Sequence, residues 1–151
     1  MKLSTKGRYG LRAMIDIAIH GKDGQISIKN IAERQNISES YLEQIIAVLK
    51  KKGFVKSCRG AQGGYHLNIE PKDISVGDIL RALEGNLDPV ECSVINDAIL
   101  CEDSELCVTK YVWKKISDSI NQVVDNITLE DLMLEQERID IETQKKDSIH
   151  S

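Results

Sequence analysis

Long apolar runs are missing from the 151-residue chain, and this absence excludes one class of protein directly. No stretch approaches the roughly twenty apolar residues that a membrane-spanning helix needs, so a membrane-spanning protein is excluded. The opening segment MKLSTKGRYG lacks the apolar core of a secretory signal, and we therefore expect a cytoplasmic protein. Internal repeats and low-complexity tracts are missing as well. The chain has no nucleotide-binding loop and no nucleophile–base pair at a recognisable spacing, which argues against an enzyme.

Net charge is small, at −4, but the two signs are unevenly distributed along the sequence. Up to Lys72 there are 13 basic and 6 acidic residues, a balance of +7, whereas the remainder has 7 basic and 18 acidic residues, a balance of −11. A basic part beside an acidic part indicates a DNA-facing half and a half with another task. Charge alone leaves open a chance clustering on a solvated surface.

The segment from Ser38 to Tyr65 carries the clearest structural pattern, which begins with a helix. Five residues recur at the three- and four-residue steps of one buried helix face, namely Tyr41, Leu42, Ile45, Ile46 and Leu49. The opposite face carries small or polar residues able to reach base edges, namely Ser40, Glu43, Gln44, Ala47 and Lys51. We expect Ser38 to be the N-cap of this helix and Gly53 to end it.

A basic, glycine-rich hairpin is expected directly after this helix. The pattern predicts a short strand at Phe54–Val55, a turn over residues 59–64 and a second strand at Tyr65–Leu67. A helix followed by such a hairpin is typical of a winged helix-turn-helix domain, with the helix in the DNA major groove and Arg59 in the minor groove. The predicted fold is therefore mainly α, with a small β-hairpin wing.

Three further helices complete the expected DNA-binding domain, which spans residues 1–84. The first covers Thr5–His20, a second begins after Ser27 and ends near Asn36, and a third covers Val76–Leu83. The start of the first helix is basic, with Lys2, Lys6, Arg8 and Arg12. Such a start suits contact with DNA phosphates, and a solvated helix end is the alternative.

The C-terminal part is expected to contain a long dimerisation helix. Apolar residues recur at steps of about four from the start of this helix, namely Val108, Val112, Ile116, Ile120, Val123 or Val124, and Ile127. The stripe is too apolar for a solvent-exposed appendage, and packing on its own domain is the alternative to dimerisation. A short helix starting at Thr128 completes the region 108–137, and residues 138–151 are expected to be a disordered tail.

Three cysteines occupy the expected loop of residues 85–107, with eight residues between Cys92 and Cys101 and five between Cys101 and Cys107. Thiolates are soft ligands, and a reducing cytoplasm keeps them available for zinc or for an iron–sulfur cluster. Spacing does not choose between the two, and three buried structural cysteines are the weaker alternative. For Cys58, on the wing, a small strand residue is favoured over a redox group.

Four segments together resemble the Rrf2 family of bacterial winged-helix regulators. They are MKLSTKGRYGLRAM, ISESYLEQI, VKSCRGAQGGYHL and NITLEDL, and the resemblance covers roughly residues 1–134. Within that family the chain is most similar to the iron–sulfur cluster regulators, whose relatives include nitric-oxide sensors and regulators of cysteine metabolism. The resemblance implies a dimeric transcription regulator that binds a two-fold symmetric operator in double-stranded DNA.

The resemblance also implies a set of DNA-contacting residues, namely Ser40, Tyr41, Glu43, Gln44, Arg59 and Gly60, and we add Lys6 and Arg8 from the basic first helix. Elementary chemistry agrees with several of these roles. Gln44 can form a bidentate hydrogen bond with adenine, and Glu43 can accept one from a cytosine amino group. Glu43 can alternatively repel unsuitable sequences. Arg59 suits a narrow, electronegative minor groove.

For the cysteines, the resemblance favours an iron–sulfur cluster held by Cys92, Cys101 and Cys107, with [2Fe–2S] preferred over [4Fe–4S]. The fourth ligand is open, because Lys110 stands where the iron–sulfur regulators have histidine and Arg8 stands where nitric-oxide sensors can have an acid. The remaining candidates are Glu102, Asp103 or Glu105, the partner subunit, or a small exogenous thiol.

The implied function is control of iron–sulfur cluster biogenesis or related stress genes, with operator binding modulated by the cluster. Two alternatives remain within the same family. One is a metal-free regulator of cysteine or sulfur metabolism that responds to thiol oxidation or to a protein partner. The other is a nitric-oxide sensor.

Overall fold

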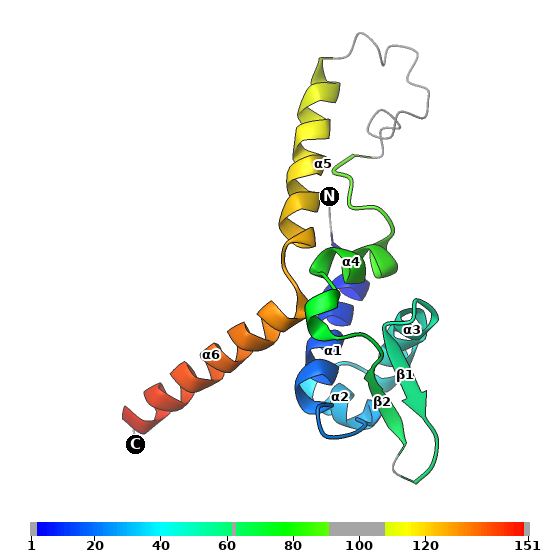
Figure 1. Cartoon of the computed structure of the whole chain (residues 1–151), viewed down its shortest axis with the longest axis vertical. Coiled ribbons are helices and arrows are strands. Elements are labelled where there is room, and N and C mark those ends of the chain that lie inside the picture. The colour runs from blue at the N-terminus through cyan, green and yellow to red at the C-terminus, as the bar shows by residue number, and fades with distance from the viewer. Residues whose placement is uncertain (1–2, 62, 91–107, 150–151) are drawn as a thin grey trace.

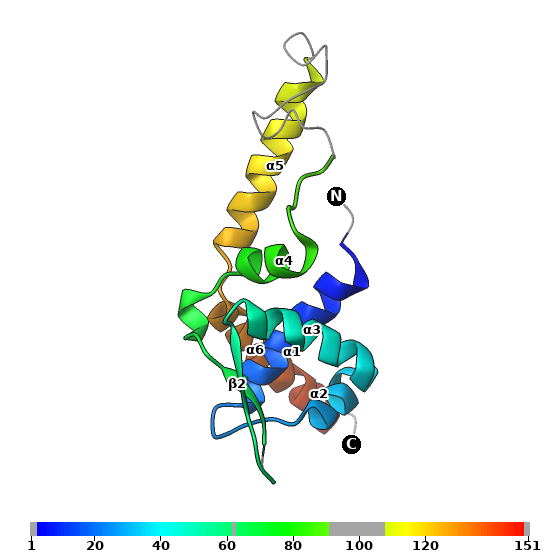
Figure 2. The same cartoon turned by 90° about the vertical axis from the view of Figure 1, so that its right-hand side faces the viewer.

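The structure is a computed structural model that describes residues 3–61, 63–90 and 108–149. Its elements are helices α1 (Thr5–His20), α2 (Ile28–Gln35) and α3 (Glu39–Lys51), strands β1 (Val55–Cys58) and β2 (Gly64–Leu67), the 3₁₀ turn η1 (Pro71–Asp73), and helices α4 (Val76–Glu84), α5 (Thr109–Asp125) and α6 (Leu129–Ile149). Figures 1 and 2 show α1 to α4 and the hairpin forming one body, from which α5 extends on the side opposite to the hairpin. The mainly helical architecture with a two-stranded wing is confirmed.

Serine side chains set the starts of three helices. Ser27 Oγ accepts a hydrogen bond from the Asn30 amide at 3.1 Å, and Ser38 Oγ accepts one from the Tyr41 amide at 3.3 Å. Ser75 and Asp78 exchange hydrogen bonds of 3.0 Å with each other's backbone amides, which is a complete capping box. These bonds satisfy amides that have no partner inside the helix, and the predicted helix starts are confirmed there.

The core of the body is built from the apolar faces of α1, α3 and α4. Leu42, Ile45, Ile46 and Leu49 of α3 are at most 1% exposed, as are Met14 and Ile17 of α1. Tyr41, which the periodicity placed on the same face, is only half-buried. A side chain at the edge of the buried face can still reach the surface.

Helices α1 and α4 cross at close range, and two glycines of α1 make the approach possible. A methyl group on Gly7 would overlap the carboxylate of Glu84, and one on Gly10 would overlap Leu83. Both contacts come from the last two residues of α4. The end of α4 is therefore in direct contact with the first two turns of α1.

The turn between α5 and α6 is hydrogen-bonded to the backbone at the start of α4. The Val76 amide donates to the Ile127 carbonyl at 2.8 Å, and the Leu129 amide donates to the Ile74 carbonyl at 2.9 Å. Arg81 adds an ion pair with Asp125 at 2.8 Å. These bonds fix the C-terminal end of α5 on the body, while its other end projects outward (Figure 1).

Helix α6 runs to Ile149 and so differs from the expected short helix followed by a disordered tail. Its second half is exposed, and the segment is held locally by charged side chains one turn apart. Arg138 pairs with Glu135 and with Glu142, the latter at 2.6 Å, and Gln136 donates to Asp140 at 3.0 Å. Pairs at these spacings stabilise a helix without tertiary packing, which a search for apolar periodicity does not detect.

Strand β1 also differs from expectation, because it covers Val55–Cys58 rather than Phe54–Val55. Its register with β2 pairs Val55 with Leu67 and Cys58 with Gly64. Within the described parts of the chain, no helix is long and apolar enough to cross a membrane.

Candidate nucleic-acid interface

Helices α2 and α3 are joined by a tight turn of the helix-turn-helix kind. Asn36 ends α2 in the left-handed conformation, with φ of 55°, and the Ile37 amide donates to the Ala32 carbonyl at 3.1 Å. Ile37 is buried, which anchors the turn on the core. Ser38 then begins α3, so the second helix is presented with its N-terminal turn at the surface.

The predicted reading residues of α3 lie on its solvent-facing side. Ser40, Glu43 and Gln44 are all exposed, while the apolar residues of the same helix face the core. No hydrogen bond to the body ties these three side chains in the described part of the chain, so they are available to a ligand. An exposed polar face of this kind suits a helix that enters the DNA major groove.

Tyr41 is placed differently from the other reading residues, because α1 holds it. Its hydroxyl lies 3.1 Å from the Thr5 hydroxyl, and its ring meets the Tyr9 ring edge-on, with centroids 6.0 Å apart and planes at 82°. Both contacts come from the first two turns of α1. Tyr41 therefore joins the recognition helix to the basic start of α1.

The wing is fastened to the body at its second strand. Ile26 and Tyr65 exchange backbone hydrogen bonds, with the Ile26 amide at 2.9 Å and the Tyr65 amide at 2.8 Å from the opposing carbonyl. Gly64 passes so close to Ile26 that a Cβ would lie 2.5 Å from the Ile26 carbonyl oxygen. Arg59 and Gly60 lie exposed at the hairpin tip, and Gly60 has φ of 120°, which glycine adopts without strain.

The basic residues of α1 divide into two groups. Arg8 is exposed and Lys6 is half-exposed, so both remain available for phosphate. Arg12 instead donates to Gln35, from Nε to the side-chain oxygen at 3.1 Å and from the terminal nitrogen to the carbonyl at 2.5 Å, with its guanidinium over the Tyr9 ring. Arg12 therefore links α1 to α2, a role that sequence reasoning missed because Gln35 is 23 residues away.

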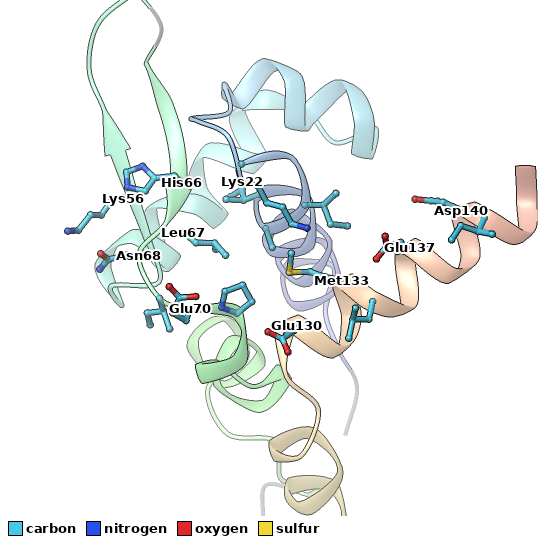
Figure 3. A pocket seen from close by; sticks show the side chains of 18 of the residues that line it. Lys22, Lys56, His66, Leu67, Asn68, Glu70, Glu130, Met133, Glu137 and Asp140 are labelled. Atoms are coloured by element: carbon cyan, nitrogen blue, oxygen red, sulfur yellow. The ribbon is translucent and has the colours of Figure 1, made fainter.

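A groove of about 1080 Å³ lies on another side of the body, between the wing strands, the end of α1 and α6. Figure 3 shows Lys56 and His66 on the wing strands, Lys22 beside the end of α1, and Glu130, Glu137 and Asp140 projecting from α6. Three carboxylates along one wall would repel a phosphate backbone. The surface that suits DNA is therefore that of α3 and the wing tip, not this groove.

The proposed ligands Cys92, Cys101 and Cys107 lie outside the described residues. Lys110 and Arg8 stand where the resemblance implies cluster ligands in relatives. Lys110 is half-buried at the start of α5, and Arg8 is exposed on α1. Among the described residues no three histidine, cysteine or acidic side chains gather to hold a metal ion. Cys58 is half-buried on β1, with Sγ 3.9 Å from Nδ1 of His66.

A turn-linked helix pair, a recognition helix with a free polar face and a fastened basic wing define a winged-helix DNA-binding protein. Comparison with known proteins gives the particular family. Residues 3–135 match the family described as "Rrf2: Iron-dependent Transcriptional regulator". The chain belongs to the Rrf2 family, whose members are DNA-binding transcription regulators and not enzymes.

Relatives of two kinds resemble the chain about equally. It is 48% identical over 132 residues to the HTH-type transcriptional regulator CymR of Bacillus subtilis (strain 168), covering 87% of this chain and 89% of CymR. The solved structure of CymR, called the global cysteine regulator of B. subtilis, superposes with a TM-score of 0.75 at 44% identity, covering 88% and 96%. The solved structure of T. potens IscR gives 0.74 at 51% identity, covering 92% and 90%. The recognised family and fold are confirmed.

Proposed function

We propose that the chain is a homodimeric regulator whose operator binding is modulated by an iron–sulfur cluster held by Cys92, Cys101 and Cys107. The observation that carries this proposal is the donor set. Three of the chain's four cysteines fall within sixteen residues, between α4 and α5. Three thiolates so close in sequence match what iron–sulfur clusters require of a protein. Controlled genes would serve cluster biogenesis or related stress responses.

The DNA-contacting surface of this proposal is the one described above. Ser40, Glu43 and Gln44 would read base edges from α3, and Arg59 with Gly60 would enter the minor groove. Tyr41, Lys6 and Arg8 would contact the backbone beside α3. Residues 1–84 would thus form the DNA-binding domain, and a two-fold symmetric operator would follow from pairing two copies.

Dimerisation is supported by an apolar face of α5 that no described part of the chain covers. Val108 is 82% exposed and Val123 is 60% exposed, and Val112 and Ile116 lie between them on the same side. The only buried residue of α5 is Ser117, on the side that packs on the body. A second copy of the same helix is the partner for which a self-complementary apolar face is suited.

Three thiolates leave the fourth ligand of the cluster open. Lysine and arginine, the residue types at positions 110 and 8, are not among the ordinary ligands of iron–sulfur clusters. A fourth ligand from Glu102, Asp103 or Glu105, from the partner subunit or from a small thiol would be held less firmly than a fourth cysteine. When bound, the cluster would supply redox and ligand-exchange chemistry, and we favour [2Fe–2S] over [4Fe–4S].

The test is purification without oxygen, followed by an absorption spectrum and by iron and sulfide analysis. The proposal expects a coloured protein with stoichiometric iron and sulfide, and a colourless one when the three cysteines are changed to serine together. Cys58→Ser is the matched control and should keep both iron and colour. Unchanged iron content in the triple variant would contradict the proposal.

The second candidate is a metal-free regulator of cysteine metabolism, favoured by the 48% identity to CymR. Such a protein would be colourless after the same purification. Its operator affinity would respond to thiol oxidation or to a protein partner, and it would not respond to iron removal. The spectrum therefore separates the two candidates before any DNA is added.

A further inference from the structure

The carboxylate of Glu84, the last residue of α4, caps the N-terminus of α1. Its Oε1 accepts hydrogen bonds from the Gly7 amide at 2.9 Å, from the Ser4 amide at 3.0 Å and from the Ser4 hydroxyl. Ser4 is the N-cap residue of α1, yet its side chain makes no capping bond to the helix. A carboxylate 77 residues away from Gly7 therefore replaces the usual local cap.

Charge and packing both favour this placement. The first turn of α1 contains no acidic residue, so the Glu84 carboxylate is the group that meets the positive end of the helix dipole. Gly7 provides the necessary space, because a Cβ there would overlap Glu84. The contact is thus built from both sides, by the absence of a side chain at residue 7 and by the acid at residue 84.

The turn that Glu84 holds is the same turn that holds Tyr41. Thr5 lies between Ser4 and Gly7, and its hydroxyl is 3.1 Å from that of Tyr41 on α3. Tyr9, one turn further on, packs edge-on against the Tyr41 ring. A continuous series of contacts therefore leads from the end of α4 through α1 to a DNA-facing side chain of the recognition helix.

We propose that Glu84 is a positioning residue for operator recognition, which sets the pose of Tyr41 by fixing the first turn of α1. Glu84 also directly precedes the part of the chain that leads to Cys92. The contact of Glu84 with α1 would also transmit to the recognition helix whether the cysteine segment holds a cluster. This second step rests on the proposed function. The direct effect of Glu84 on operator recognition does not rest on the cluster.

The substitution Glu84→Ala should change operator affinity in opposite directions, depending on whether Glu84 positions Tyr41 or acts only through its charge. Removing a carboxylate near the DNA-facing start of α1 should strengthen attraction to phosphate if charge alone matters. The positioning role instead predicts that affinity for the operator falls by about fivefold. Affinity for a scrambled duplex should stay equal or rise. The probes are a duplex selected by the wild-type protein from a randomised pool and its scrambled counterpart.

Three comparisons complete the test. Glu84→Gln keeps an oxygen acceptor for Ser4 and Gly7, so it should restore operator affinity to within about twofold of wild type. Glu130→Ala, which removes an exposed carboxylate on α6, should leave the operator-to-scrambled ratio unchanged. In a Tyr41→Phe background, the effect of Glu84→Ala should shrink to less than about twofold, because the hydroxyl contact is already lost.

The proposal is overturned if Glu84→Ala leaves the operator-to-scrambled ratio at the wild-type value, whether both affinities fall, rise or stay the same. It is also overturned if the effect of Glu84→Ala is unchanged in the Tyr41→Phe background. A last measurement repeats the operator titration on protein purified without oxygen, before and after iron removal by a chelator. Wild type should differ between the two forms, and Glu84→Ala should not. If wild type does not differ, the proposed function fails, while the operator-to-scrambled ratio still decides the role of Glu84.

Discussion

Two nitrogen atoms of Arg34, on α2, donate hydrogen bonds to the buried carboxylate of Asp16 on α1. Its terminal nitrogen lies 2.7 Å from Oδ1 and its Nε lies 2.9 Å from Oδ2, while Gln35 Nε2 donates to Oδ2 at 2.9 Å. The Asp16 side chain has no solvent exposure, and Arg34 retains 34%. The hydrogen bonds to Asp16 raise the pKa of Arg34 above its usual value. Because Arg34 is a base, its raised pKa means that the folding stability contributed by the pair with Asp16 is fully present below the usual pKa of arginine. That stability is lost only as the pH rises through the raised pKa, so the pair is intact at neutral pH.

Removing Arg34 should therefore destabilise the body. Arg34→Met leaves the buried Asp16 carboxylate with Gln35 alone, and we expect a loss of about 2–3 kcal/mol, less than for a fully buried pair because water reaches Arg34. Urea unfolding followed by circular dichroism measures it. Arg138→Met, which removes two exposed ion pairs on α6, is the control and should leave the unfolding midpoint unchanged. Equal midpoints for wild type and Arg34→Met would contradict the expectation.

Local signals in the sequence were enough to predict most of the elements. Ser27, Ser38 and Ser75 each lie at the start of an amphipathic pattern, and each cap depends on residues three positions away. Long-range polar contacts gave no such signal. Asp16 reads as an ordinary helix residue, and Glu84 lies far from Ser4 in sequence, so only folding brings these partners together.

The candidate DNA-contacting residues also divide into those whose placement a local pattern predicts and those whose placement depends on long-range contacts. The exposure of Ser40, Glu43 and Gln44 follows from the helical period, and it is found as expected. The sequence placed Tyr41 on the buried face, and its link to Thr5 depends on how α1 crosses α3, which no local pattern contains. The cysteines remain a prediction from chemistry, since they lie outside the described residues.

Gly64 should be essential to the wing. A Cβ at this position would lie 2.5 Å from the Ile26 carbonyl oxygen and 2.6 Å from its carbonyl carbon, and backbone atoms cannot move aside cheaply. We expect Gly64→Ala to cost about 1–3 kcal/mol of stability and to weaken operator binding, because β2 would be pushed away from Ile26. Thermal unfolding and a DNA-binding titration measure the two effects.

Ser57→Ala serves as the control for this substitution. Ser57 lies in the same hairpin opposite Tyr65, and its side chain is exposed. Its loss should change neither the melting temperature nor operator affinity. A Gly64→Ala protein as stable as Ser57→Ala would show that the wing is not held by the close approach to Ile26.

Arg59 and Lys22 should differ sharply in their effect on DNA binding, although both are exposed cations. Arg59 is at the wing tip, whereas Lys22 lines the groove that the α6 carboxylates share. Arg59→Ala should weaken binding to the selected operator by about 1–3 kcal/mol, and Lys22→Ala should leave it unchanged. Titrations at several salt concentrations should also show a shallower salt dependence only for Arg59→Ala. Equal effects of the two substitutions would place the DNA on a different face.

The exposed face of α5 offers the sharpest test of the proposed dimer. Ile116, 38% exposed in the single chain, lies on the same side of the helix as Val112 and Val123. Ile116→Glu would bury an unpaired carboxylate twice in each symmetric interface, so the dimer dissociation constant should rise about 100-fold. Gln122→Glu adds the same charge to an exposed position at the flank of the helix and should leave the dimer intact. Sedimentation velocity over a range of concentrations distinguishes these outcomes. If Ile116→Glu sediments as wild type does, α5 does not join the two copies through this face.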